Sequence, residues 1–317
     1  MHIQRTIRER IQWLSETSRP FFGQFSLWVL LLASMYLVGS LDGGYPHRDK
    51  GVTVSVIGYI LSASVFSNEQ LFELCRYAFF AASLCWFFRK FLPVSSWLTV
   101  ILYTVTISFY WENLPWFRHK YVLPNWLLLV YALWMHFYQD DIRAARKEKR
   151  FWNTALFPNW VLFLSVFSIA VLYTYSGISK LRWVGWEWGN GLSLQIWMTL
   201  FGDSDSWITR LILSDRLYAM VLQSGTLLLE CLAFLAIFSR RCRIVIAVGL
   251  ISLHLSVAMT FHIDFATNVV LLSVYFLPID RLIPRLVARI RTAVAESLPP
   301  ELTVAGTVSV DRDERFG

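Results

Sequence analysis

The sequence predicts an all-α integral membrane protein, a bundle of about eight transmembrane helices with a further interfacial helix at the outer face. Apolar residues make up 56% of the chain and charged residues only 16%, and the mean hydropathy is +0.48. A soluble globule of this composition would lack the polar residues needed to cover its surface. In addition, the apolar residues form runs of membrane-spanning length, and basic residues gather at the ends of these runs.

The runs predicted to span the membrane are residues 22–41, 71–88, 94–110, 121–138, 158–178, 217–238, 243–262 and 266–283. Lys and Arg are abundant in alternate connections and sparse in the others; the rich connections are residues 5–19, 89–90, 143–150, 240–243 and 281–291. Because basic loops stay on the cytoplasmic side of a membrane, this alternation predicts that both termini are cytoplasmic.

The predicted domain organisation is a basic cytoplasmic arm at residues 1–20, a transmembrane domain at 21–285, and a cytoplasmic, partly disordered tail at 286–317. The run from Val52 to Phe66 is short and rich in Ser and Gly, so we expect an interfacial or re-entrant helix there. The run from Leu192 to Phe201 is also too short to cross. It is predicted to be the outer-face helix, where it could roof a cavity.

The formal charge of +7 points to membrane lipid rather than nucleic acid as a partner, because the basic residues cluster at span ends. Four cysteines form no CxxC pair and have no histidine at metal-ligand spacing, so we expect small core residues and no metal site; they are Cys75, Cys85, Cys231 and Cys242. The sequence contains no Walker loop, nucleophile elbow or HExxH helix, which removes the usual support for hydrolases and nucleotide-driven pumps.

Ionisable side chains inside predicted spans are energetically costly, so they carry most of the functional information. Lys180 ends the fifth predicted span and follows Tyr173 and Tyr175. Its side chain could reach outward to the lipid headgroups. Alternatively, it could face inward among aromatic residues, where burial favours the neutral amine that can accept a proton. The position of Lys180 leaves both interpretations open.

Glu230 and His254 lie at similar depths in consecutive predicted spans, differing by about 5 Å at the helical rise per residue. They could pair to hold the bundle in register, or relay protons to a ligand. His119 and His262 lie at outer span ends, where a solvated histidine is the simpler interpretation, but both share the predicted side of Lys180. The residues considered as possible lining of a pocket are Tyr173, Tyr175, Trp183, Trp186 and His262.

Three motifs follow one another along residues 20–285. The first is Phe117-Arg-His119-Lys-Tyr121-Val-Leu, and the second is Gly177-Ile-Ser-Lys180-Leu, followed by a Trp and by Gly189 and Gly191. The third combines Leu229-Glu230-Cys-Leu-Ala-Phe, Arg240-Arg241-Cys-Arg243 and Leu253-His254-Leu. In order and spacing, this set resembles the transmembrane domain of vitamin K-dependent gamma-carboxylase and the wider bacterial HTTM group. An Arg stands in the first motif where the family has Asn.

The resemblance implies a membrane enzyme that oxygenates a reduced naphthoquinone or other quinol to an epoxide, with Lys180 as the base. It also implies that His119 supports carboxylation of a glutamate carbanion. The quinol would then be the cofactor, O2 and CO2 would be co-substrates, and the partners would be a lipoquinone and a small peptide or secreted protein. From the bacterial group we expect a location in the bacterial inner membrane, with the site on the outer side.

Two other functions stay open. Small HTTM proteins include the membrane component of a sporulation-delaying toxin system. The chain could therefore be a non-catalytic or quinone-independent partner in maturation or export of a small peptide toxin, with Lys180 only reaching the headgroups. A proton-coupled transporter that uses Glu230 and His254 as a relay ranks third, because the sequence contains no inverted repeat or pair of broken helices.

Overall fold

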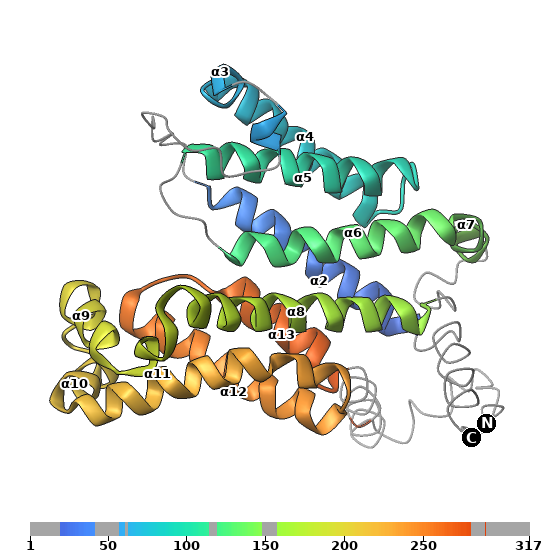
Figure 1. Cartoon of the computed structure of the whole chain (residues 1–317). Helices are drawn as coiled ribbons and strands as arrows, with labels where there is room; N and C mark the ends of the chain where they lie inside the picture. Colours follow the sequence, from blue (N-terminus) through green and yellow to red (C-terminus); the bar gives the residue numbers. More distant parts are fainter. Residues whose placement is uncertain are drawn as a thin grey trace, which may run out of the picture. The chain divides into compact units, whose positions relative to one another are not determined.

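The structure is a computed structural model that describes residues 20–41, 57–60, 63–113, 119–147, 157–279 and 289. This part of the chain is built from helices and short connections, without a β-strand (Figure 1). The all-helical class expected from the sequence is therefore confirmed for the described residues. The predicted arm and tail, 1–20 and 286–317, lie outside them except for residues 20 and 289. The chain divides into two compact units, Met1–Leu277 and Pro278–Gly317.

Each run predicted to span the membrane coincides with a helix. In chain order these helices are α2 (Pro20–Gly39), α4 (Glu69–Phe87), α5 (Val94–Asn113), α6 (Val122–Phe137), α8 (Asn159–Val184), α11 (Arg216–Cys231) with the 3₁₀ helix η4 (Leu232–Ile237), α12 (Arg240–Phe261) and α13 (Ala266–Phe276). The observed ends differ from the predicted ones by a few residues. The largest difference is at α13, which ends at Phe276, whereas the predicted run was 266–283.

Several of these helices can cross a bilayer. Five segments of the described chain are long and apolar enough, namely Phe22–Gly39, Val94–Glu112, Asn159–Gly189, Arg216–Ile237 and Arg240–Phe261. α6 and α13 are apolar but shorter, and α4 carries Glu69, Glu73 and Arg76 within its 19 residues. The chain is thus a helical membrane protein, whereas the number of about eight crossings stays a prediction.

Shorter elements connect the long helices. They are η1 (Ile57–Tyr59), α3 (Ala63–Phe66), η2 (His119–Tyr121), α7 (Gln139–Lys147), η3 (Gly185–Gly189), α9 (Leu192–Phe201) and α10 (Trp207–Ser214). The predicted short helix at Leu192–Phe201 is confirmed as α9. The run Val52–Phe66 is only partly described, and its described residues form a 3₁₀ turn and a four-residue helix.

Polar side chains fix the start of several helices by accepting a hydrogen bond from an otherwise unpaired backbone N–H. Asn68 accepts from Leu71 N–H (3.0 Å) before α4, and Asp215 accepts from Leu217 N–H (2.8 Å) before α11. The second contact begins α11 directly after α10, so the chain turns sharply between these helices.

The core of the first unit lies where α2, α6, α8 and α13 pack together. Tyr131 of α6 is fully buried there; its hydroxyl lies 2.6 Å from Ser26 Oγ of α2, and its ring centroid lies 6.4 Å from that of Tyr275 in α13. In a bilayer, helices associate through close packing and such interhelical hydrogen bonds, because lipid tails are as apolar as the core. These contacts hold α6 in place, and α6 in turn packs against α8.

α8 also packs on α11 and η4, and α12 packs on η4 and α13. The two short helices α9 and α10 lie together at one end of α11 and α12 (Figure 1). Three buried apolar side chains hold them there: Met198 of α9, Ile212 of α10 and Ala219 of α11. The resulting group, made of α8 to α12, contains the candidate site.

Candidate functional site

Lys180 of α8 and Glu230 of α11 form an ion pair between Nζ and Oε2. The side chain of Glu230 is 8% exposed and that of Lys180 is 27% exposed, so neither charge is fully hydrated. Ser176, one turn before Lys180, also donates a hydrogen bond to the carboxylate of Glu230. An unpaired carboxylate at this depth would be costly, and the lysine and serine compensate it.

A glycine permits this pairing. A Cβ on Gly177 would lie 2.7 Å from the backbone N and 2.8 Å from Sγ of Cys231, both too close for any other residue without a shift. Gly177 therefore lets α8 approach the end of α11 at backbone distance. Lys180 lies three residues after Gly177 and so projects from the same face of α8 toward Glu230.

A second glycine brings an indole over the lysine. Gly185, with φ +70°, ends α8 and accommodates a backbone conformation that favours glycine. The chain then turns into η3, and the ring centroid of Trp188 lies 4.8 Å from Lys180 Nζ. This cation–π distance adds an aromatic contact to the ion pair.

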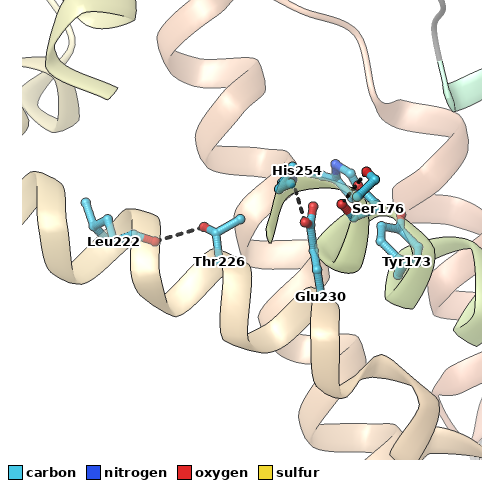
Figure 2. Close-up of polar contacts among 8 residues, drawn as sticks. Tyr173, Ser176, Leu222, Thr226, Glu230 and His254 are labelled. Carbon is cyan, nitrogen blue, oxygen red and sulfur yellow. Dashed lines mark hydrogen bonds and ion pairs between the residues drawn. The ribbon is translucent and has the colours of Figure 1, made fainter. Parts of the chain in front are cut away.

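A chain of buried polar groups lies beside the pair. Tyr173 of α8 has its hydroxyl 2.6 Å from Nε2 of His254 in α12, and Asn268 of α13 donates from Nδ2 to the same hydroxyl (3.1 Å). All three residues are less than a tenth exposed. The ring of His254 also stacks on Phe265, with centroids 4.7 Å apart. Figure 2 shows Tyr173, Glu230 and His254 approaching one another from three helices.

Lys180, Glu230 and His254 line a cavity of about 1210 Å³ between α8, η3, α9, α10, α11 and α12. Most of the other lining residues are apolar, for example Leu194, Trp197 and Leu253. Cavities that bind organic molecules have this composition, a mostly apolar wall with a few polar groups at one place. Here, three of the polar groups belong to the buried cluster.

The segment that covers the cavity is hydrogen-bonded to α11. Gly191, with φ +81°, precedes α9 and donates its backbone N–H to Oε1 of Gln223 (3.1 Å). Gln223 in turn donates from Nε2 to Ser193 Oγ. Because α9 lines the cavity, these contacts agree with the expectation that residues 192–201 roof a cavity.

The remaining predicted residues lie elsewhere. Tyr175, Trp183 and Trp186 are more than 60% exposed on the chain and do not belong to the cavity lining, in which Trp188 stands instead. Tyr173 lies behind His254 rather than in the wall. His262 caps α12 with φ +52° and pairs at 3.4 Å with Asp203, also outside the lining. His119 begins η2, but its side chain is not among those described.

The structure also shows residues that the sequence did not single out. Phe265 stacks on His254, Asn268 donates to the Tyr173 hydroxyl that contacts His254, and Gln223 holds the segment before α9. Polar residues inside apolar helices were a usable signal for Asn268 and Gln223. No sequence signal pointed to Phe265, because aromatic residues occur throughout this chain. Within the described residues, no group of three or more His, Cys, Asp or Glu side chains could hold a metal ion.

Comparisons of the chain with models of protein families, with curated proteins and with solved structures find no match. The chemistry of the site therefore has to be inferred from its residues. An apolar cavity that ends at a lysine, a carboxylate and a histidine can bind a largely apolar molecule by its body and exchange a proton with its polar end.

Proposed function

We propose that the protein is a membrane enzyme of the vitamin K-dependent carboxylase type, which binds a reduced quinone in the cavity and uses Lys180 as the base. The observation that supports this most strongly is the position of Lys180. It lines a large apolar cavity together with Glu230 and His254 and forms an ion pair with the Glu230 carboxylate. A lysine that only reached for headgroups would have no need of a buried carboxylate partner.

The residues present fit a quinol. The apolar wall suits a fused aromatic ring and an isoprenoid tail, and the polar cluster suits hydroxyl or carbonyl oxygens. When bound, a reduced quinone would supply an acidic hydroxyl and the four electrons that reduce O2, because the overall reaction of quinol and O2 gives quinone epoxide and water.

The ion pair supplies the proton acceptor. One proton is shared between Lys180 and Glu230; when Glu230 holds it, the amine of Lys180 is neutral and can accept the proton of a ligand hydroxyl. Glu230 thus acts as the local proton store for Lys180. The apolar side chains of the cavity wall would limit the access of water to the pair once a ligand is bound.

Carboxylation of a peptide or protein substrate with CO2, assisted by His119, is the second half of the proposal and rests on the sequence resemblance. The bacterial inner membrane and the outward-facing site also rest on that resemblance, whereas the number of about eight crossings and the cytoplasmic termini rest on the apolar runs and the alternation of basic connections. Five helical segments of spanning length among the described residues support a membrane location.

The experiment is oxidation of a panel of reduced naphthoquinones and benzoquinones by purified protein in nanodiscs under oxygen, with epoxide scored by mass spectrometry. Wild type should form epoxide from at least one quinol, and Lys180→Ala should lose at least about 100-fold in rate, the lower end of what a positioned general base contributes. Arg182→Ala is the matched control, because Arg182 is exposed near the same end of α8 and outside the cavity lining. It should retain wild-type activity.

Two results would count against the proposal. Equal loss in Lys180→Ala and Arg182→Ala would show that charge at the end of α8, and not the base, matters. No turnover of any quinol by intact, folded protein would overturn the enzyme and favour a non-catalytic partner in peptide maturation.

A further inference from the structure

The hydrogen bonds around Tyr173 restrict the protonation of His254. Asn268 donates from Nδ2 to the Tyr173 hydroxyl (3.1 Å), so one lone pair of this oxygen is used. The hydroxyl carries a single proton, and its other close contact is Nε2 of His254 at 2.6 Å. Tyr173 is buried, and a buried hydroxyl proton without an acceptor is costly. The network therefore assigns Tyr173 as the donor and Nε2 as the acceptor.

A neutral imidazole has one N–H and one acceptor nitrogen. If Nε2 accepts from Tyr173, the proton of His254 resides on Nδ1. Within the described part of the chain, no second hydrogen bond to the His254 ring is present, and His254 lines the cavity. Phe265 stacks on the ring and restrains its rotation. Among the described residues, the Nδ1–H group is thus a donor without a partner.

We propose that Tyr173 and Asn268 are positioning residues that hold His254 as the Nδ1–H tautomer, and that this N–H donates a hydrogen bond to an oxygen of the ligand in the cavity. The identity of this ligand as a quinone or quinol rests on the proposed function. Lys180 and His254 then contact the polar end of the ligand with different roles. Lys180 exchanges the proton, whereas His254 orients an oxygen and stabilises negative charge on it.

The tautomer can be measured without any ligand. The chain has six histidines, and ring-¹⁵N labelling with solid-state NMR in bilayers distinguishes Nδ1–H from Nε2–H; the His254 signals are those lost in His254→Gln. Wild type should show Nδ1–H, and Tyr173→Phe should show loss of this form in favour of Nε2–H. Tyr175→Phe, two residues further along α8 and exposed, should leave the spectrum unchanged. An Nε2–H signal in wild type would overturn the inference.

The donor role of His254 is tested by measuring the equilibrium binding of 2-methyl-1,4-naphthoquinone to the protein in nanodiscs. The amount that partitions into empty nanodiscs is subtracted. In His254→Asn the side-chain amide nitrogen lies near the position of Nδ1 of the histidine. In His254→Gln the side-chain amide nitrogen lies near the position of Nε2. His254→Asn should therefore keep the affinity within a few-fold, whereas His254→Gln should weaken it about tenfold. A purely structural His254 predicts the reverse order, because Gln alone keeps the contact with Tyr173.

The outcomes separate the two proposals. Quinol turnover together with an Nε2–H tautomer, or with the reverse order of the two His254 variants, overturns this inference and leaves the proposed function standing. Binding with the expected order but without epoxide overturns the proposed function and leaves the donor role standing. Absence of naphthoquinone binding by wild type overturns both.

Discussion

At the scale of single residues, the site could be predicted in part. Lys180, Glu230 and His254 could be identified from the sequence because an ionisable side chain inside an apolar helix is rare and costly. Their partners could not. Depth along a helix places Glu230 and His254 at one level, but the rotation of each helix about its axis decides which groups meet, and the structure pairs Glu230 with Lys180 and His254 with Tyr173.

The tryptophans illustrate a similar limit. Trp183, Trp186 and Trp188 lie within six residues of one another in sequence, and spacing alone could not show which would face a cavity. α8 ends at Gly185, and of these three tryptophans it is Trp188 whose ring lies over Lys180. A positive φ at one glycine thus decides the lining of this part of the cavity.

Asp264, in the connection between α12 and α13, gives a pH-dependent prediction at this scale. Burial raises the pKa of Asp264, but hydrogen bonds from the Ala266 N–H and the Tyr36 hydroxyl, together with the charge of Lys120, outweigh it, so the pKa lies below its ordinary value of 3.8. A lowered pKa in the folded state stabilises the fold above the ordinary value and is lost as the pH falls through the folded-state value.

We therefore expect the melting temperature in nanodiscs to fall as the pH drops below the ordinary value of 3.8, and Asp264→Asn to remove part of this fall. The contribution should stay below about 1 kcal/mol, because the Tyr36 side chain that contacts Asp264 is half-exposed. The difference between wild type and variant isolates Asp264 from the other carboxylates. Identical pH profiles for the two proteins would contradict the assignment.

At the scale of elements, the helices themselves were predictable because a long apolar run has few alternatives in lipid. The predicted runs coincide with α2, α4, α5, α6, α8, α11 with η4, α12 and α13, and the short run 192–201 is α9. The ends of the helices and the close contacts between helix backbones were harder to predict from the sequence. The contact of α8 with the end of α11 depends on Gly177, whose role shows only in the distances to Cys231.

A pair of glycine variants tests this contact. Gly177→Ala should lower the free energy of unfolding by about 1–3 kcal/mol, because its Cβ would overlap the backbone at Cys231 and force α8 away from α11. Gly225→Ala in α11 is the control, because a Cβ there has no atom within 4 Å. It should be neutral or stabilise by up to about 1 kcal/mol through helix propensity. Thermal denaturation in nanodiscs gives both values, and equal shifts would refute the role of Gly177.

At the scale of the whole molecule, composition and hydropathy suffice to indicate a helical membrane protein, and the described part of the chain has five helical segments of spanning length. They do not identify the ligand, because an apolar wall discriminates weakly among apolar molecules. The central claim is accordingly that the cavity holds a quinone-type molecule with its polar end at Lys180, Glu230 and His254.

The most direct test is to extract and identify by mass spectrometry the molecules that co-purify with the protein from its own membrane. Gly225 lines the cavity, and a Cβ added there has no atom within 4 Å, so Gly225→Phe should place its ring in the cavity and compete with the ligand without unfolding the protein. We predict a lipoquinone in stoichiometric amount with wild type and with Gly225→Ala, and its loss in folded Gly225→Phe. No quinone in wild type, or equal amounts in all three proteins, would contradict the assignment of the cavity.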